Sequence, residues 1–546
     1  MRPIQDVAAD LGLTPDDLVP YGAHMAKISL TALRRIQAQP PGGKLILVSA
    51  INPTKFGEGK TTTSIGLAQG LRRIGRKPCL ALREPSLGPI FGMKGGGTGG
   101  GKCMLEPSSR INMHFTGDKH AVTSAHNLLA ALVDNAINFE SGIDLEHRQI
   151  LWRRVLDMND RFLRRIVIGL GGRANGVPRE DGFDITAASE VMAVLCLAKD
   201  LQDLKARLGR ILVGFDREGK PVTAASLKAT GAMAALLQDA ILPNLVQSTE
   251  GVPAFVHGGP FGNIAHGCNS IVATGAALAL GEYAITEAGF GFDLGAEKFF
   301  DIKCRLSGYW PSAVVLVVTA RALRAHGGDD GKKELTSAQA LEALGKGIEH
   351  LDQHASSARN FGFTPLVSIN GFPNDSEAEL HLIEEGCAKR GLPCSRFWGF
   401  GKGGEGAEDL ARKVVEAAAK PASPPRFLYT LDQDPAEKIR AIAQTSYGAK
   451  QVNFTKDAEK DLAKARALGY GNLPICMAKT HLSLSDDPLA VGRPKGFELT
   501  VRSVRIAAGA GYLLAMTGEI VTMPGLPAAP ASMKFDLTDD GQVLGI

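Results

Sequence analysis

The residues best suited to chemistry stand together in one short glycine-rich stretch, Gly57-Glu58-Gly59-Lys60-Thr61. Glycines in such a loop let backbone N–H groups surround an anion, and the N-terminus of a following helix adds its positive dipole. A lysine at this place reaches the outer phosphates of a nucleotide, and a threonine hydroxyl can bind Mg²⁺. We therefore predict a phosphate-binding loop in which Lys60 is catalytic and Thr61 is the metal ligand. The predicted ATP-binding residues are Thr54, Gly57, Glu58, Gly59, Lys60, Thr61 and Thr62.

The flanking sequence favours this prediction over a surface turn of the same composition. Residues 45–48 form an apolar run of strand length, and from Ile65 to Leu71 apolar residues recur at helical spacing. The strict loop pattern is not met, because Thr54 occupies the place of the first glycine. Lys55 lies five residues before Lys60, which is the position of the extra lysine in deviant phosphate loops. Its side chain would either add a positive charge at the nucleotide or be solvated.

A second glycine-dense stretch, residues 83–101, follows a strand predicted at 78–82. Loops at the carboxyl ends of neighbouring parallel strands meet in one crevice, which would place Arg83 beside the phosphates. Its planar guanidinium can hold a carboxylate or an acyl phosphate at two points, so we predict a catalytic role. A mobile flap is the alternative for this stretch. Asp118 is the third predicted catalytic residue, as a partner of Mg²⁺ or a positioning base.

Aromatic residues stand in loops that follow predicted strands. Phe372 and Pro373 come directly after a strand at 366–369, and Trp398 precedes a glycine loop at 399–406. Each aromatic residue alone could anchor a core. Exposed at strand ends, however, aromatic side chains are stacking surfaces, and together they predict a flat heterocyclic substrate. The histidines at 114, 120, 257 and 266 are compatible with structural or chemical roles, and the sequence leaves these open.

The composition excludes several classes of protein. The 546 residues are 44% hydrophobic and 22% charged, as in ordinary globular proteins, and a net charge of +4 is too small to predict a nucleic-acid partner. The longest apolar run, at 313–320, is far below the ~20 residues of a membrane span. The start of the chain is too polar for a signal peptide. Eight cysteines without a C-x-x-C motif indicate reduced thiols, so we expect a cytoplasmic protein without a membrane partner.

Short branched strands alternate with helical segments, which predicts an α/β fold of the P-loop NTPase type, with a mostly parallel sheet flanked by helices and additional smaller α/β domains. We expect residues 1–40 to be mostly helical and further helices at 121–137, 145–165 and 186–208. The predicted domains are an ATP-binding domain at 1–355 with an insertion at about 140–250, an α/β domain at 356–425 and a C-terminal α/β domain at 426–546.

Several long motifs occur in a fixed order: PTKFGEGKTTTSIGLAQGL, REPSLGPIFGMKGGGTGGG, NMHFTGDKHA, GFGFDLGAEKFFDIKCR, INGFPNDSEAE, AKTHLSLSDDP and AGAGYLLAMTGEIVTMPGLP. With them, the chain resembles formate–tetrahydrofolate ligase (formyltetrahydrofolate synthetase), of the monofunctional bacterial type, over essentially its whole length. The resemblance implies an enzyme of one-carbon metabolism that uses ATP to ligate formate to tetrahydrofolate. The products would be 10-formyltetrahydrofolate, ADP and phosphate, formed through a formyl phosphate intermediate.

The resemblance also implies site residues, cofactors and assembly. Lys60 and Thr61 would serve ATP and Mg²⁺, and Arg83 would hold formyl phosphate. Phe372 and Trp398 would sandwich the folate ring, with Pro373 beside them, so that the domain at 356–425 contributes the folate site. The family is homotetrameric and is activated by a monovalent cation, K⁺ or NH₄⁺. Asn52, Lys55 and Phe56 depart from the usual loop of this family.

Two other functions stay open at this point. The deviant loop with Lys55 would suit an ATPase switch or metallochaperone, although such a protein has no need of the downstream aromatic loops. Another carboxylate-activating ligase could use the same loop on a larger acid.

Overall fold

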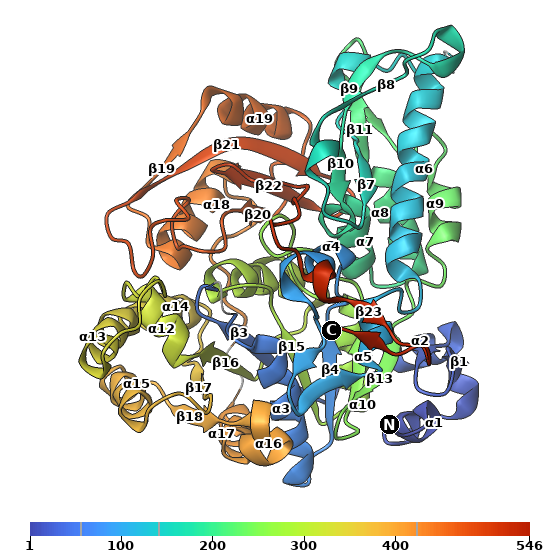
Figure 1. The fold of residues 1–546 in the computed structure, drawn as a ribbon. Helices are drawn as coiled ribbons and strands as arrows, with labels where there is room; N and C mark the ends of the chain where they lie inside the picture. The colour runs from blue at the N-terminus through green and yellow to red at the C-terminus, as the bar shows by residue number, and fades with distance from the viewer. Residues whose placement is uncertain (55–56, 140–141, 422–423, 546) are drawn as a thin grey trace.

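A twelve-stranded sheet forms the centre of the computed structural model, which describes residues 1–54, 57–139, 142–421 and 424–545 (Figure 1). From β14 to β18 all neighbouring strands pair in parallel. In spatial order the strands are β1 (Leu18–Pro20), β2 (Ala26–Ile28), β13 (Asn244–Ser248), β14 (Pro253–Val256), β4 (Pro78–Leu82), β15 (Tyr283–Glu287), β3 (Lys44–Ala50), β16 (Ala313–Val318), β17 (Leu366–Asn370) and β18 (Cys394–Phe397), with β5 (Gly99–Gly100) and β6 (Cys103–Glu106) attached beside β13.

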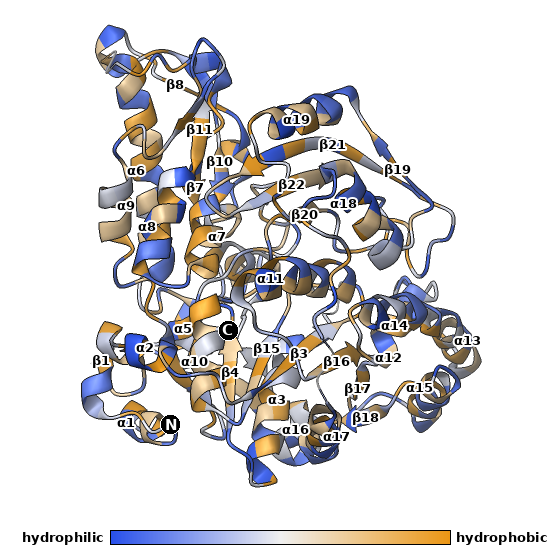
Figure 2. Cartoon of the chain, turned by 180° about the vertical axis from the view of Figure 1, so that it is seen from behind, coloured by the Kyte–Doolittle hydropathy of each residue, from blue (hydrophilic) through white to orange (hydrophobic). Residues whose placement is uncertain are grey.

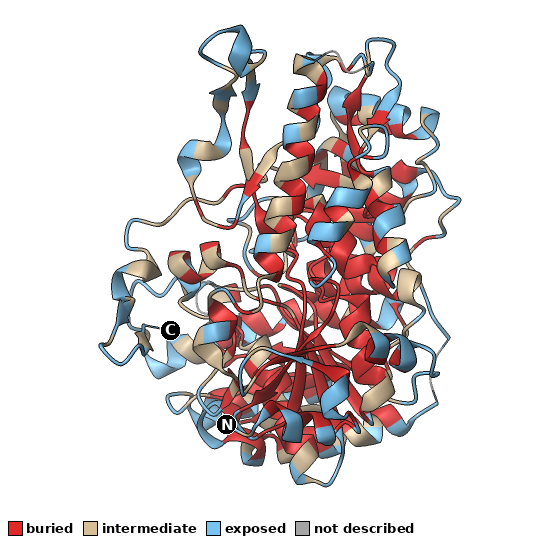
Figure 3. Ribbon diagram, turned by 90° about the vertical axis from the view of Figure 1, so that its right-hand side faces the viewer, coloured by how far each residue is buried: buried red, intermediate tan, exposed pale blue. Residues whose placement is uncertain are grey.

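The central strands are continuous apolar runs because both faces of the sheet are covered. Along β3, Leu45 and Leu47 enter one hydrophobic cluster, whereas Ile46 and Val48 enter the other. Burial on both faces is typical of parallel sheets between helices. The buried strands form the core of the lower part of the molecule in Figure 3, and β4 and β16 have hydrophobic colours in Figure 2. These features confirm the predicted α/β fold.

Helices on the two faces hold the sheet in place. One face carries α3 (Lys60–Arg73), α16 (Gly399–Lys402) and α17 (Glu408–Ala419). The other is covered by α2 (Leu30–Gln37), α7 (Glu190–Leu197), α10 (Ile271–Leu280), α12 (Ala320–His326) and α14 (His350–Asn360). The remaining helices of the main body are α1 (Ile4–Ala9), α4 (Leu87–Pro89), α5 (Ser108–Asn112), α11 (Arg305–Ser307), α13 (Ser337–Ile348) and α15 (Glu377–Lys389).

The segment from α6 (Asp118–Asn138) to α9 (Thr230–Leu236) extends away from the sheet at the top of Figure 1. It also contains α8 (Leu201–Arg210), β7 (Arg154–Leu156), β8 (Ile166–Ile168), β9 (Arg179–Asp181), β10 (Phe183–Ile185), β11 (Leu212–Phe215) and β12 (Pro221–Thr223). The prediction of a helix at 145–165 is wrong, because β7 within this range pairs with β10. Arg154 of β7 also forms ion pairs with Asp134 and Asp181. These distant partners override the local helical pattern. The helix expected at 186–208 is interrupted between α7 and α8, where Asp200 caps the second helix.

The C-terminal part has a four-stranded sheet and a hydrophobic core of its own. It contains α18 (Pro435–Ile442), β19 (Gln451–Phe454), α19 (Lys456–Ala467), β20 (Ile475–Ala478), β21 (Glu498–Ala507) and β22 (Tyr512–Thr517), followed by the strands β23 (Asp536–Leu537) and β24 (Val543–Leu544). The large sheet crosses residue 355, since β17 and β18 continue it beyond β16. The division of the chain into domains stays a prediction. Among the described residues, no helix combines the length and apolar character that a membrane span needs.

Candidate functional site

The glycine-rich loop joins the carboxyl end of β3 to the first turn of α3, as the sequence predicts. Gly57 and Gly59 have φ angles of 73° and 76°, a left-handed conformation that favours glycine. A side chain at position 59 would also collide with the amide of Asn370. Within the loop, the Thr54 N–H donates to Glu58 Oε1 at 2.7 Å. Lys55 and Phe56 lie outside the described residues, so the question of an extra charge from Lys55 stays open.

Thr61 is held by an acidic residue of the neighbouring strand. Its hydroxyl donates to Glu287 Oε2 at 2.9 Å, and Glu287 is the buried last residue of β15. A hydroxyl and a carboxylate provide the hard oxygen ligands that Mg²⁺ prefers, with phosphate oxygens and water completing the shell. The donor set therefore fits Mg²⁺ carried by ATP. Glu287 is not among the residues predicted from the sequence, although an acidic side chain at the end of a buried strand is a signal for a site at that strand end.

Lys60 lies at the centre of a group of alternating charges. Desolvation lowers the pKa of its ammonium group, and the carboxylates of Glu58, Glu287 and Asp293 counteract this effect. Repulsion from Arg83 lowers the pKa of Lys60 further. Positive charge is therefore concentrated at the loop. Without a bound anion, the nearby carboxylates balance this charge.

Arg83 directly follows β4, on the other side of β15 from the loop. Its Nη2 lies 3.8 Å from Glu287 Oε1, and its Nη1 donates to Pro260 O at 3.3 Å. The Nε group is buried and has no hydrogen-bond partner among the described residues. Because β15 lies between β3 and β4, Glu287 contacts both Thr61 and Arg83. The structure thus brings together the predicted residues Lys60, Thr61 and Arg83.

Asp118 occupies a different environment. Lys27 Nζ lies 2.7 Å from Asp118 Oδ1, and Asn244 Nδ2 donates to Asp118 Oδ2 at 2.7 Å. Both oxygens are therefore engaged in a buried network at the start of α6. Removing either partner of this buried ion pair would be strongly destabilising. The role of Asp118 as a partner of Mg²⁺ or a positioning base stays a prediction.

The predicted aromatic residues follow the ends of two adjacent strands. Asn370 of β17 is in register with Phe397 of β18, so Phe372 and Trp398 follow neighbouring strands. A Cβ at Gly371 would lie 2.8 Å from Trp398 Cζ3, which places the indole against that backbone. Phe400, which sequence reasoning missed, is 46% exposed, and its ring centroid lies 6.1 Å from that of Phe372.

Asn370 connects these aromatic residues to the phosphate-binding loop. Its Nδ2 donates to Glu58 O at 3.2 Å, and Phe372 is only two residues further along the chain. A flat ligand on the aromatic side chains and an anion in the loop would therefore be neighbours. Pro373 is exposed beside Phe372.

The four histidines whose roles the sequence leaves open lie in different environments. His257 is a satisfied core residue, with its ring nitrogens 2.6 Å from Ser270 Oγ and Ala240 O. His266 is buried, and neither ring nitrogen has a partner in the part of the chain that the structure describes. His114 and His120 are exposed.

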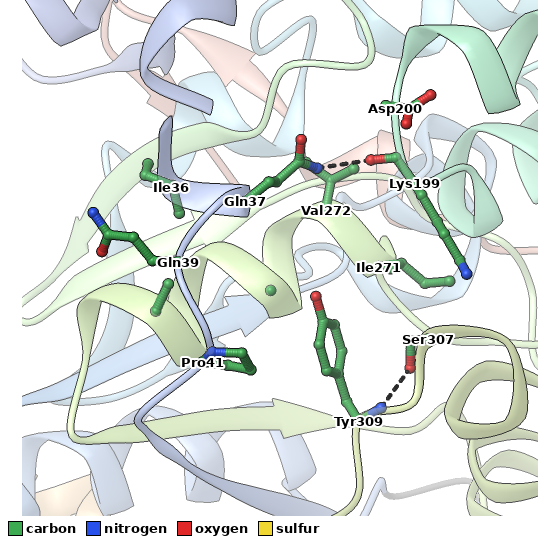
Figure 4. A pocket seen from close by; sticks show the side chains of 12 residues that line it. Ile36, Gln37, Gln39, Pro41, Lys199, Asp200, Ile271, Val272, Ser307 and Tyr309 are labelled. Atoms are coloured by element: carbon green, nitrogen blue, oxygen red, sulfur yellow. Dashed lines mark hydrogen bonds between the residues drawn. The ribbon is translucent and has the colours of Figure 1, made fainter. Parts of the chain in front are cut away.

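A separate hollow of about 260 Å³ lies where α2 and α10 approach residues 307–309. Figure 4 shows Gln37, Lys199 and Tyr309 among its lining residues. Gln37 Nε2 donates to Lys199 O at 2.7 Å. No predicted site residue lines this hollow, so we assign it no part in phosphate or folate binding.

Comparison with known proteins gives a consistent result over the whole chain. The family model described as formate–tetrahydrofolate ligase matches residues 1–546. A formate–tetrahydrofolate ligase of Myxococcus xanthus (strain DK1622) is 56% identical, covering 100% of this chain and 99% of the relative. Another, from Methylobacterium sp. (strain 4-46), is 54% identical, covering 100% and 98%.

Proposed function

Because the chain belongs to the formate–tetrahydrofolate ligase family, we propose that the crevice at the carboxyl ends of β3, β4, β15, β17 and β18 is where it ligates formate to tetrahydrofolate with ATP. The observation that carries this proposal is the link made by Asn370, which joins the phosphate-binding loop to the aromatic residues. One end of the site suits a triphosphate and the other suits a pterin ring. This combination has no use in an ATPase switch.

The chemistry requires activation of formate, because a carboxylate is a poor electrophile. An oxygen of formate attacks the γ-phosphorus of ATP, and the bond from this phosphorus to the bridging oxygen breaks to release ADP. The N10 amine of tetrahydrofolate then attacks the carbon of formyl phosphate, the bond from carbon to the phosphate oxygen breaks, and N10 loses a proton. The products are 10-formyltetrahydrofolate, ADP and phosphate.

The side chains have distinct roles in this sequence. Lys60 and the loop backbone hold the β- and γ-phosphates, and Arg83 holds the acyl phosphate, so fixed positive charge faces the group that is transferred. Thr61 and Glu287 would hold Mg²⁺, which neutralises phosphate charge when it is bound with ATP. Phe372, Pro373 and Trp398, with Phe400 beside them, position the pterin ring over the formyl carbon. A monovalent cation (K⁺ or NH₄⁺), a homotetramer and a cytoplasmic location remain part of the proposal.

Phosphate release by the purified protein tests the function. We expect release of phosphate and formation of 10-formyltetrahydrofolate only when ATP, formate and tetrahydrofolate are all present. ATP hydrolysis that needs neither formate nor tetrahydrofolate would support the ATPase switch. Turnover with a larger carboxylic acid, but not with formate, would support a different carboxylate-activating ligase.

Glu287→Gln is expected to weaken the use of Mg²⁺. Loss of the carboxylate that holds Thr61 should raise the Mg²⁺ concentration needed for half-maximal ADP binding by about 10- to 100-fold. Calorimetric titration with ADP at a series of Mg²⁺ concentrations measures this shift. Glu282→Gln is the control. Glu282 immediately precedes β15, at the end of the strand opposite to Glu287, and pairs with Arg76 at the surface. An unchanged Mg²⁺ requirement in Glu287→Gln would place the metal elsewhere.

We expect Trp398→Ala and Phe372→Ala to weaken the binding of tetrahydrofolate much more than the binding of ATP. Stacking on an aromatic side chain is worth roughly 1–3 kcal/mol, which corresponds to about 5- to 150-fold in affinity. The KM values for tetrahydrofolate and ATP report the effect, and Phe162→Ala, at an exposed position on the segment that extends from the sheet, is the control. A raised KM for ATP with an unchanged KM for tetrahydrofolate would mean that these rings contact adenine.

A further inference from the structure

Three buried histidines form a cluster next to the phosphate-binding loop, and none of them takes part in the mechanism. His326 ends α12, while His350 and His354 lie one turn apart on the same face of α14. The rings of His326 and His350 stack with centroids 4.0 Å apart, and the Nε2 atoms of His350 and His354 are separated by 3.1 Å. Neither α12 nor α14 contains a predicted site residue.

The cluster is attached to the loop through Asn52, a buried residue two positions after β3. His326 Nε2 lies 2.9 Å from Asn52 O. His354 Nε2 lies 3.3 Å from Asn52 N and 3.1 Å from Asn52 Oδ1. Two histidines therefore contact three of the four polar groups of the residue at which the loop begins.

The hydrogen bonds define the protonation of His326. The backbone N–H of Gly492 donates to His326 Nδ1 at 3.3 Å, so the ring proton is on Nε2 and is donated to Asn52 O. Asn52 N–H in turn points to His354 Nε2, which requires a neutral imidazole. Burial keeps both rings neutral, because desolvation lowers the pKa of His326 and lowers that of His354 to about 4.

The fourth polar group of Asn52, its side-chain Nδ2, connects this residue to the charges around Lys60. Asn52 Nδ2 donates to Asp293 Oδ1 at 3.0 Å, and Asp293 Oδ2 lies 3.2 Å from Lys479 Nζ in a fully buried pair. The Asp293 carboxylate also favours the charged form of Lys60. Movement of Asn52 would therefore change both the backbone of the loop and the electrostatic support of its lysine.

We propose that His326 and His354 are positioning residues for the phosphate-binding loop and act through Asn52. The inference rests on the proposed role of the loop in binding ATP. Burying an imidazole is unfavourable unless its nitrogens form hydrogen bonds, and Nδ1 of His350 and of His354 has no partner among the described residues. The bonds that His326 and His354 do make hold the backbone carbonyl and N–H of Asn52, which an apolar filling of this space would leave without partners. The hydrogen bonds of the cluster thus fix the point from which the loop departs, before a nucleotide binds.

Two variants of His354 in the full-length chain test the proposal. In His354→Leu the backbone N–H of Asn52 loses its acceptor, so we expect the Kd of Mg²⁺-ADP and the KM of ATP to rise about ten-fold. The KM of tetrahydrofolate should stay within about two-fold of wild type. His354→Gln, whose amide can again bond to Asn52, should recover most of the lost ADP affinity. Calorimetry gives Kd, steady-state kinetics gives KM, and thermal unfolding gives Tm.

His126→Leu is the matched control. His126 is also buried, with ring nitrogens 2.7 Å from Ser189 Oγ and 2.9 Å from Arg153 O, and it stacks on Trp152 at 4.0 Å. We expect this variant to lower Tm and to leave the Kd of ADP within about two-fold of wild type. If His354→Leu lowers Tm but retains ADP affinity in the same way, the cluster is only structural and the proposal is overturned.

If His354→Leu does not fold, His326→Leu tests the same proposal, because in this variant Asn52 loses only the donor to its backbone carbonyl.

The outcome of these experiments can be distinguished from a failure of the proposed function. ADP binding is compared between variants and wild type without formate or tetrahydrofolate. Wild-type protein that binds no ADP would instead contradict the ATP site itself.

Discussion

Lys60→Ala is expected to reduce kcat at least 10²- to 10³-fold, which is the usual loss when one preorganised donor is removed from a developing negative charge. The ammonium group of Lys60 lies among Glu58, Glu287 and Arg83 at the start of α3, where the phosphates of ATP would lie. Without it, the transferred phosphoryl group loses its nearest compensating charge. Steady-state formation of 10-formyltetrahydrofolate measures the effect.

Lys44→Ala provides the control for that variant. Lys44 is the first residue of β3, so it lies at the opposite end of the same strand from the loop. We expect near-wild-type kcat from this variant. Near-wild-type kcat from Lys60→Ala as well would show that the loop does not hold the reacting phosphate.

The α/β fold follows from the sequence because the central strands are buried on both faces. The runs at 45–48, 314–318 and 366–369 are apolar throughout, apart from Ser368, and all lie in parallel strands of the sheet. The loop and Phe372 were predictable for a related reason. Lys60 follows the first run through the glycine-rich loop and Phe372 lies two residues after β17, and the carboxyl ends of parallel strands share one edge. Trp398 follows β18, which is not an apolar run, so only the adjacent glycine loop indicated it.

Residues whose roles depend on distant partners could not be predicted in this way. Glu287 meets Thr61 only because β15 lies between β3 and β4, although more than 200 residues separate the two in sequence. The same limit applies to Asp118, whose partner Lys27 is 91 residues away. The buried pair with Lys27 could not be read from the local pattern, and the role of Asp118 as a partner of Mg²⁺ or a positioning base stays a prediction.

Two asparagines take connecting positions in this site. The Asn370 amide joins the loop to the proposed folate-binding aromatic residues, and Asn52 joins it to the histidine cluster through its backbone and to Asp293 through its side-chain amide. An amide provides a donor and an acceptor without charge, so it can link elements without disturbing the balance around Lys60. Substitution of Asn52 or Asn370 by aspartate would add a negative charge at the base of the site that we propose binds ATP.

Arg83→Gln is expected to separate the two chemical steps from nucleotide binding. An amide retains some hydrogen bonding but loses the charge and the two-pronged geometry of the guanidinium, so formation and use of formyl phosphate should both fall at least ~10²-fold. ADP affinity should stay within a few-fold of wild type, since Lys60 and the loop backbone are unchanged. Arg83→Lys keeps the charge only and should give an intermediate loss.

The half-reaction that makes ATP from ADP and carbamoyl phosphate, a stable analogue of the intermediate, isolates this effect. Arg83 lies beside Glu287 and Pro260, on the far side of β15 from the loop, where an acyl phosphate would extend away from ADP. ATP synthesis should therefore collapse in Arg83→Gln while ADP binding persists. If ATP forms from carbamoyl phosphate at the wild-type rate, Arg83 only supports the strand end through its contact with Pro260, and another group holds the acyl phosphate.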